Sequence, residues 1–113
     1  MDTAPVDAMP LTRDFKDTVK ARAERDPAFR LGLFEDAIGS FLDGDVNTGK
    51  SLLRDDVNAT IGFERLGADR HKSPKSLMRM LSPRGNPRAD NMFAIVAHLK
   101  DQDGIDLRAR SRV

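Results

Sequence analysis

The feature that most constrains the fold is a helix-start signal that occurs twice, at Asp26-Pro27 and at Ser73-Pro74. Asp and Ser are favoured N-cap residues, and proline is favoured at the first helical position, where its missing N–H is not needed. Around these two starts, apolar residues recur at intervals of three and four, as in amphipathic helices. Only the tail, at Ile105, Leu107 and Ala109, alternates weakly with the period of a strand. The chain is therefore predicted to be all-α.

The same signals predict about six short helices around one core. The first follows a cap at Thr12, the second and third follow caps at Asp26 and Asp45, and the fourth spans residues 63–70 after a break at Gly62. The fifth spans residues 74–81, and the sixth spans residues 89–102 and stops at Gly104. The apolar set predicted to face the core comprises Phe15, Val19, Ala23, Phe29, Leu33, Phe34, Ile38, Phe41, Leu42, Val46, Leu52, Leu53, Val57, Ile61, Leu77, Met80, Leu81, Met92, Phe93, Ile95, Val96 and Leu99.

The length of 113 residues fits one domain. Residues 1–10 are expected to form a loose tail, residues 11–104 a single helical domain, and residues 105–113 a basic tail. The absence of cysteine excludes disulfides and thiolate zinc sites. No apolar run approaches the roughly 18–20 residues of a membrane span, and the first ten residues lack the pattern of a signal peptide. We therefore expect a cytoplasmic protein with no membrane partner.

The net charge of +1 hides a strong asymmetry along the chain. Residues 1–69 hold nine Lys and Arg against fourteen Asp and Glu, a net charge of −5, whereas residues 70–113 hold ten against four, a net charge of +6. Such an asymmetry indicates two kinds of partner, although surface charges also cluster by chance.

The segment from Gly44 to Ser51, GDVNTGKS, matches the phosphate-binding pattern G-x-x-x-x-G-K-[ST] in every letter. A true P-loop needs a buried strand before it and a helix after it. The preceding residues here have helical apolar spacing, and no later strand offers an acidic partner for magnesium. We therefore interpret Asp45 as an N-cap and Gly49 as a glycine tolerated within a helix, at a cost of about 1 kcal/mol, and we expect no nucleotide cofactor.

The stretch most indicative of function runs from Arg70 to Ala89 and holds six cationic residues and no carboxylate. It overlaps a helix-turn-helix candidate at about residues 63–81, in which two short helices are joined through His71 and Lys72. Leu77, Met80 and Leu81 share the face predicted to pack on the core, which leaves Pro74, Lys75, Met78 and Arg79 on outer faces. The alternative is a solvated basic helix without a nucleic-acid role.

A cationic helix of this kind fits the major groove of DNA. Arg79 is predicted to pair with a guanine edge, and Ser76 to contact a base or a phosphate. The start of the helix also offers free N–H groups to a phosphate. Loop cations hold phosphates, which gives affinity without sequence choice. The predicted DNA-binding residues are Lys72, Ser73, Pro74, Lys75, Ser76, Arg79, Arg84 and Arg88.

Several ordered blocks resemble one known family. They are LTRDFKDTVKAR at residues 11–22, RDPAF at 25–29, TGKSLLRD at 48–55, NATIGFE at 58–64, KSPKSLMRMLSP at 72–83 and GNP at 85–87. Together they cover roughly residues 11–103 and are similar to the addiction-module antidote proteins, the HigA-like antitoxins of type II toxin–antitoxin pairs. That family carries a lambda-repressor-like helix-turn-helix of the Cro/repressor class.

The resemblance implies a homodimer that binds a palindromic operator in its own promoter, represses transcription and neutralises a RelE/ParE-like toxin. Two residues depart from the family pattern. Gly67 stands where alanine is expected in the first helix of the motif and should weaken it, and His71 stands where the glycine of the turn is expected. His71 is therefore predicted to adopt a positive φ, which histidine tolerates better than most residues.

Nothing in the sequence indicates an enzyme, a metal site or a cofactor. His71 and His98 are the only histidines, and His98 is expected to be a surface or half-buried residue. Asp55 and Asp56 are neighbours on a helix and point about 100° apart, so they do not converge on one substrate. The alternative to a DNA-binding autorepressor is a protein-binding module that mainly sequesters a partner. In that case the acidic N-terminal part would face a basic toxin.

Overall fold

The computed structural model of the chain describes residues 13–112, with side chains from Thr18 onward. It is all-helical and contains six helices in this part of the chain, as the sequence predicts. The Thr12 cap, the Phe15 side chain and the tail at residues 1–10 lie outside what is described. The helices are α1 (Arg13–Arg25), α2 (Pro27–Leu42), α3 (Val46–Ala59), α4 (Phe63–Arg70), α5 (Pro74–Met80) and α6 (Ala89–Gln102).

The predicted caps determine where the helices begin. Asp26 Oδ1 accepts hydrogen bonds from the backbone N–H groups of Ala28 and Phe29 at 3.1 and 3.2 Å. Asp45 Oδ1 accepts one from Thr48 N at 3.2 Å, and Ser73 Oγ accepts one from Ser76 N at 3.1 Å. Because these bonds satisfy amide groups that have no partner within the helix, three of the six helix starts are explained by local chemistry.

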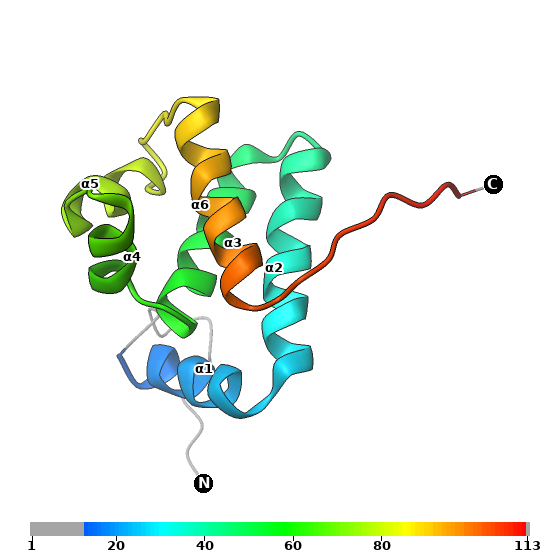
Figure 1. Cartoon of the computed structure of the whole chain (residues 1–113), viewed down its shortest axis with the longest axis horizontal. Coiled ribbons are helices and arrows are strands. Elements are labelled where there is room, and N and C mark those ends of the chain that lie inside the picture. Colours follow the sequence, from blue (N-terminus) through cyan, green and yellow to red (C-terminus); the bar gives the residue numbers. More distant parts are fainter. Residues whose placement is uncertain (1–12, 113) are drawn as a thin grey trace, which may run out of the picture.

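The helices form one cluster in which α2 and α3 run side by side and α6 crosses in front of them (Figure 1). Helix α1 closes one end of the cluster, and the short pair α4 and α5 projects on the side away from α2. The last described residues leave the end of α6 as an extended segment that passes α2 and stands clear of the helices. No helix within residues 13–112 is both long and apolar enough to cross a membrane.

The core lies where α2, α3, α4, α5 and α6 meet, and most of the predicted apolar set contributes to it. Its buried members are Phe34, Ala37, Leu53, Val57, Phe63, Leu66, Leu77, Leu81, Ile95, Val96 and Leu99. The core prediction was wrong at three positions, because Leu42 is 82% exposed, Phe93 is 66% exposed and Val46 is 46% exposed. All three lie near a helix end, where the neighbouring helices no longer cover the apolar stripe.

Candidate nucleic-acid interface

The connection between α4 and α5 is short and sharply bent. Helix α4 ends at His71, which adopts the left-handed conformation with φ 57° and ψ 43°, as predicted. Lys72 N then donates to Gly67 O at 3.0 Å, and Ser73 caps α5. A left-handed residue after the last turn is a common way to end a helix and redirect the chain. Three residues therefore join the two helices.

Gly67 has a different role from the one predicted for it. A Cβ at this position would lie 2.5 Å from the backbone oxygen of Lys72 and 3.4 Å from Cδ of Pro74. Gly67 is therefore required by the close approach of the turn to α4, rather than being only a weak point in that helix. Pro74 is half-buried in the same region, so it is less accessible than an outer-face residue.

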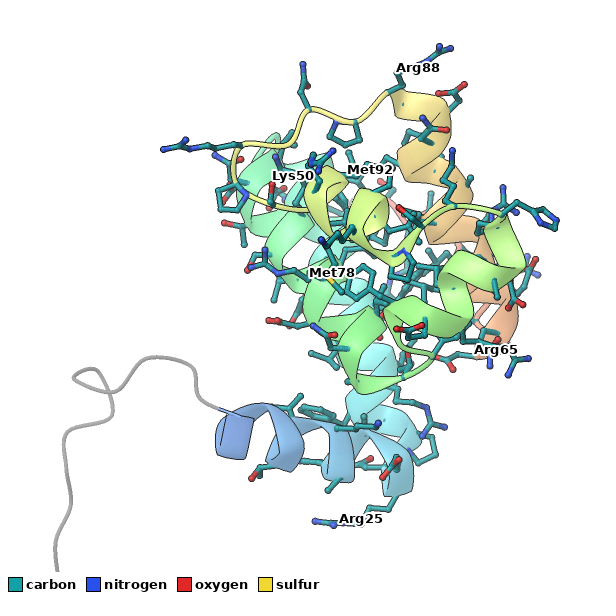
Figure 2. The ribbon with its side chains drawn as sticks, turned by 90° about the vertical axis from the view of Figure 1, so that its left-hand side faces the viewer. Arg25, Lys50, Arg65, Met78, Arg88 and Met92 are labelled. Carbon is teal, nitrogen blue, oxygen red and sulfur yellow. The ribbon has the colours of Figure 1, made fainter. Side chains whose placement is uncertain are left out.

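Helix α5 exposes a cationic face. Leu77 is buried and anchors the helix to the core, while Lys75, Ser76 and Arg79 are exposed on other sides. Met78 lies between these residues with 45% of its surface exposed, and its position on this side of the molecule is visible in Figure 2. The division into an inner and an outer face agrees with the prediction for Leu77, Lys75, Met78 and Arg79.

The cations of this region differ in how they are paired. No ion pair to Lys72, Lys75, Arg79 or Arg84 is formed within the described residues, and all four side chains are exposed. Arg88 instead lies at the start of α6 (Figure 2) and pairs with Asp90, with 3.3 Å between Nη2 and Oδ2. The four unpaired cations are therefore free to contact an anionic ligand, whereas Arg88 would have to share its charge with Asp90.

Lys50, the lysine of the P-loop-like sequence, is tied to the loop that follows α5. It is only 3% exposed, and its Nζ donates to Gly85 O at 2.6 Å. The residues before the segment from Gly44 to Ser51 form α2, not a strand, which excludes the P-loop geometry. Glycine is favoured at position 49, and not merely tolerated within the helix, because a Cβ there would lie 2.7 Å from the Phe41 ring. The segment therefore holds the loop in place and binds no phosphate in the P-loop manner.

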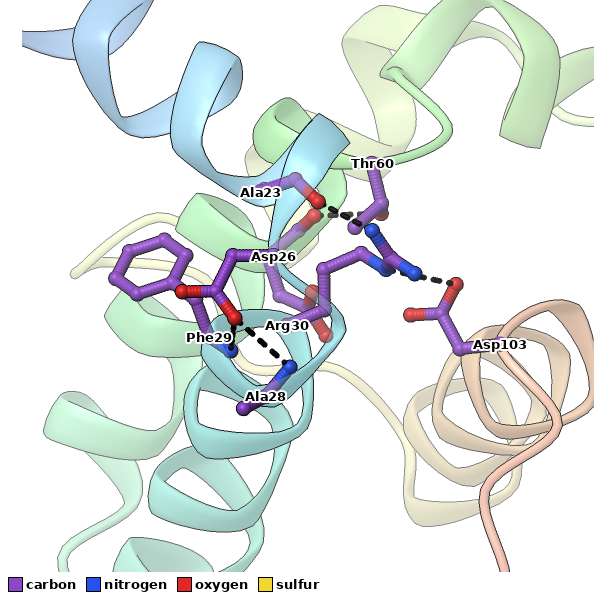
Figure 3. Close-up of polar contacts among 8 residues, drawn as sticks. Ala23, Asp26, Ala28, Phe29, Arg30, Thr60 and Asp103 are labelled. Atoms are coloured by element: carbon purple, nitrogen blue, oxygen red, sulfur yellow. Dashed lines mark hydrogen bonds and ion pairs between the residues drawn. The ribbon is translucent and has the colours of Figure 1, made fainter.

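Sequence reasoning missed a partly buried charged cluster at the junction of α1, α2, α3 and the end of α6, where Figure 3 shows Arg30 and Asp103. Arg30 donates through Nη1 to Ala23 O and lies 3.9 Å from Asp103 through its Nε. Asp56 is fully buried, and neither carboxyl oxygen has a hydrogen-bond partner. Desolvation raises the pKa of Asp56 to about 7, with a further contribution from the charge of Asp103. Burial also raises the pKa of Asp103, against the opposing effect of Arg30.

An apolar groove of about 340 Å³ opens where the end of α2 and the start of α3 meet the start of α6. Val46 and Phe93, two of the misjudged residues, line it, and Phe41 and Met92 form other parts of its wall. Exposed apolar surface of this kind is typical of protein interfaces and ligand grooves. The groove is thus a second surface with the character of a binding site.

The described residues do not gather the donors of a metal site, since no group of three or more His, Asp or Glu side chains is placed to hold an ion. His98, half-buried on α6, pairs instead with Asp69, with 3.2 Å between Nε2 and Oδ2. In comparisons with protein-family models, curated proteins and solved structures, nothing matches the chain.

Proposed function

We propose that the protein binds double-stranded DNA through α5 and the loop after it, as an autorepressor of the antitoxin type. Helix α5 and its preceding turn would act as the second half of a helix-turn-helix, with α5 in the major groove. Lys75, Ser76 and Arg79 would reach base edges or phosphates, and Lys72 and Arg84 would hold phosphates. Ser73 and Pro74 would start and orient the helix. Arg88 would hold a phosphate at the edge of this surface.

The observation that carries the proposal is the exposure of four cations, Lys72, Lys75, Arg79 and Arg84, that pair with no carboxylate among the described residues. Some exposed cations elsewhere pair with a neighbouring carboxylate, such as Arg65 with Asp69 at 3.4 Å. The four cations on and next to α5 make no such pair within the described residues, so their positive charge is available to a polyanion. The rigid connection through Gly67 and His71 also supports the proposal, because a positioned helix is needed to read base edges.

The wider part of the proposal follows from the resemblance to antitoxins. The protein would bind a palindromic operator as a homodimer, repress transcription and neutralise a RelE/ParE-like toxin in the cytoplasm. The half-sites would lie about one helical turn of DNA apart, because each copy presents one recognition helix. No catalytic residue and no cofactor are part of this function.

The test is fluorescence anisotropy with DNA from upstream of the gene, using the wild-type chain and Arg79→Ala. We expect Arg79→Ala to weaken binding by roughly 1–3 kcal/mol, because one base contact is lost. The matched control is Arg25→Ala, which removes an exposed arginine at the opposite end of the molecule from Arg88 (Figure 2). Flat, weak binding that ignores both substitutions and the salt concentration would refute the DNA-binding function.

The apolar groove favours a second candidate function, in which the chain mainly sequesters a protein. A partner would place apolar side chains against Val46 and Phe93, while the acidic charge of residues 1–69 would attract a basic toxin. The sharp test is Phe93→Ser in the full chain, with toxin rescue in cells as the readout. A deletion of residues 1–45 would not test the toxin-binding surface, because it also removes core residues such as Phe34. Full rescue by Phe93→Ser would exclude the groove as the toxin site.

A further inference from the structure

Much of the extended C-terminal segment, residues 106–110, has no backbone partner among the described residues. Ile105 N donates to Lys100 O at 2.9 Å, but residues 106–110 make no backbone–backbone hydrogen bond within the described chain. The segment, residues 105–112, which we call the arm, leaves the helices beside α2 (Figure 1). An extended segment with free N–H and C=O groups is a ready template for pairing with another strand.

The sequence of the arm is complementary to itself when read in the opposite direction. Residues 105–109 read Ile-Asp-Leu-Arg-Ala, with an apolar residue at each end, an acid and a base next to the centre, and Leu107 in the middle. In an antiparallel pair centred on Leu107, each Asp106 lies opposite Arg108 of the other strand. Opposite charges placed directly across an antiparallel pair stabilise it.

We propose that two copies of the chain assemble by antiparallel pairing of their arms, with the two Leu107 residues facing each other at the two-fold axis. The paired span is residues 105–109 of each copy. Asp106 and Arg108 already attract each other within one arm, at 3.1 Å, so pairing joins four alternating charges on one face. Ile105, Leu107 and Ala109 form the other face, because side chains alternate along a strand.

An isolated pair of strands is marginal in water, so the arms need an apolar surface to cover. That surface is present at the base of the arm, where a groove of about 280 Å³ lies between α2 and the chain that follows α6. Leu31 and Ile105 line this groove, Leu31 is 38% exposed, and Ile105 packs against the core. Pairing centred on Leu107 brings Ala109 of the second copy opposite Ile105, at the edge of the groove.

The charges around the groove are compatible with this occupant. Arg30 and Asp103 on its wall already pair with each other, and among the described residues Asp106 is the one other charged residue that lines it. A second arm therefore meets Asp106, which already pairs with Arg108 of its own arm, and places a second Arg108 opposite it. The inference concerns only the assembly of two copies within the proposed function, and it does not depend on DNA binding.

The first test measures molar mass by light scattering across protein concentration, without DNA. We expect a dimer for the full chain and a twofold lower mass for Leu107→Pro, because proline removes a backbone donor from the centre of the pair. Arg112→Pro is the matched control, since it makes the same change outside the paired span and should leave the dimer intact. A monomer at every concentration, or a dimer that survives Leu107→Pro, would overturn the proposal.

The second test addresses the charges. Asp106→Arg or Arg108→Asp alone places like charges opposite each other twice per dimer, so each should raise the dimer dissociation constant about tenfold. The double variant Asp106→Arg/Arg108→Asp restores opposite charges and should recover most of the affinity. Failure of the double variant to recover would mean that the two residues do not face each other.

The third test determines the register. The chain has no cysteine, so Leu107→Cys introduces a single thiol. Residues directly opposite in an antiparallel pair have Cβ atoms about 4.5–5.5 Å apart, so mild oxidation should link the two copies through Cys–Cys contact at this position. Arg110→Cys lies off the axis and should not link. Equal linking by both variants would contradict the register, whatever the outcome of the DNA-binding experiment.

Discussion

Two regions of the molecule hold charged side chains in opposite environments. Around α5, cations such as Lys75 and Arg79 are exposed and pair with no carboxylate in the part of the chain that the structure describes, so water solvates them at little energetic cost. At the junction of α1, α2, α3 and α6, Asp56 is fully buried without a hydrogen bond, next to the pair formed by Arg30 and Asp103. Unpaired charge therefore has a different meaning in each place. At the surface it marks availability for a ligand, whereas in the interior it costs stability.

The largest effect is expected when the buried carboxyl group of Asp56 is replaced. Asp56→Asn keeps the shape of the side chain and cannot ionise. The pKa of Asp56 is raised from 3.8 to about 7, so between these values the folded protein holds a proton that the unfolded chain has released. Wild-type stability therefore falls as pH rises through this window, by on the order of 4 kcal/mol at about 1.4 kcal/mol per unit. We expect Asp56→Asn to remove this loss, which urea denaturation at pH 3, 5 and 8 would measure.

Asp43→Asn is the control for this experiment, because it neutralises an exposed carboxylate at the end of α2. It should change stability by less than about 0.5 kcal/mol at each pH. Arg79→Ala should likewise leave stability unchanged within that range, which separates the surface cations from the buried acid. If wild type and Asp56→Asn showed parallel pH profiles, the buried carboxyl would not be the titrating group.

A smaller effect is expected from Gly67→Ala, which tests how rigidly the cationic end is held. A methyl group here meets the backbone oxygen of Lys72 at 2.5 Å, and a backbone atom cannot move aside as a flexible side chain would. The turn must shift, so we expect a loss of about 1–3 kcal/mol in the free energy of unfolding, despite the better helix propensity of alanine. DNA affinity should fall as well, since α5 would move with the turn.

Gly32→Ala in α2 is the matched control, because a Cβ there meets nothing within 4 Å. It should stabilise the protein by up to about 1 kcal/mol through helix propensity alone. Parallel urea titrations of the two variants give the comparison. Equal stabilisation by both would show that the turn does not press on α4.

The predictability of the fold follows from how local each signal is. Asp26, Asp45 and Ser73 cap the helices that their neighbours in sequence predict, because a cap depends on residues within one turn. Gly67 and Gly49 could not be understood in this way, because the atoms that exclude a side chain come from another segment. Helical spacing also identifies the apolar face of a helix, but it does not show how far along the helix the neighbouring helices bury that face. This explains the errors at Leu42 and Phe93.

The candidate site was likewise predictable where its features depend on the local sequence, and not where they depend on distant segments. The absence of carboxylates between Arg70 and Ala89 is a property of the sequence, and it anticipated the exposed cations. The sequence carries no such signal for Asp56, because it does not distinguish Asp56 from its neighbour Asp55. Only the packing of the helices buries one of them fully. The partner of Lys50 is a carbonyl 35 residues away, so its burial depends on the loop after α5 and not on its own neighbours.

The smallest effect is expected at the turn before α5. His71 adopts φ 57°, a left-handed conformation that costs a residue with a Cβ about 1–2 kcal/mol relative to glycine. His71→Gly should therefore stabilise the protein by about 1 kcal/mol, the remainder being offset by the greater freedom of glycine in the unfolded chain. His71→Ala keeps the strain and removes only the ring, so it should not stabilise, and thermal denaturation of the two variants would show the difference. DNA affinity should be unchanged in both if the ring does not contact phosphate, whereas an equal loss in both would make His71 part of the binding surface and extend that surface onto the turn itself.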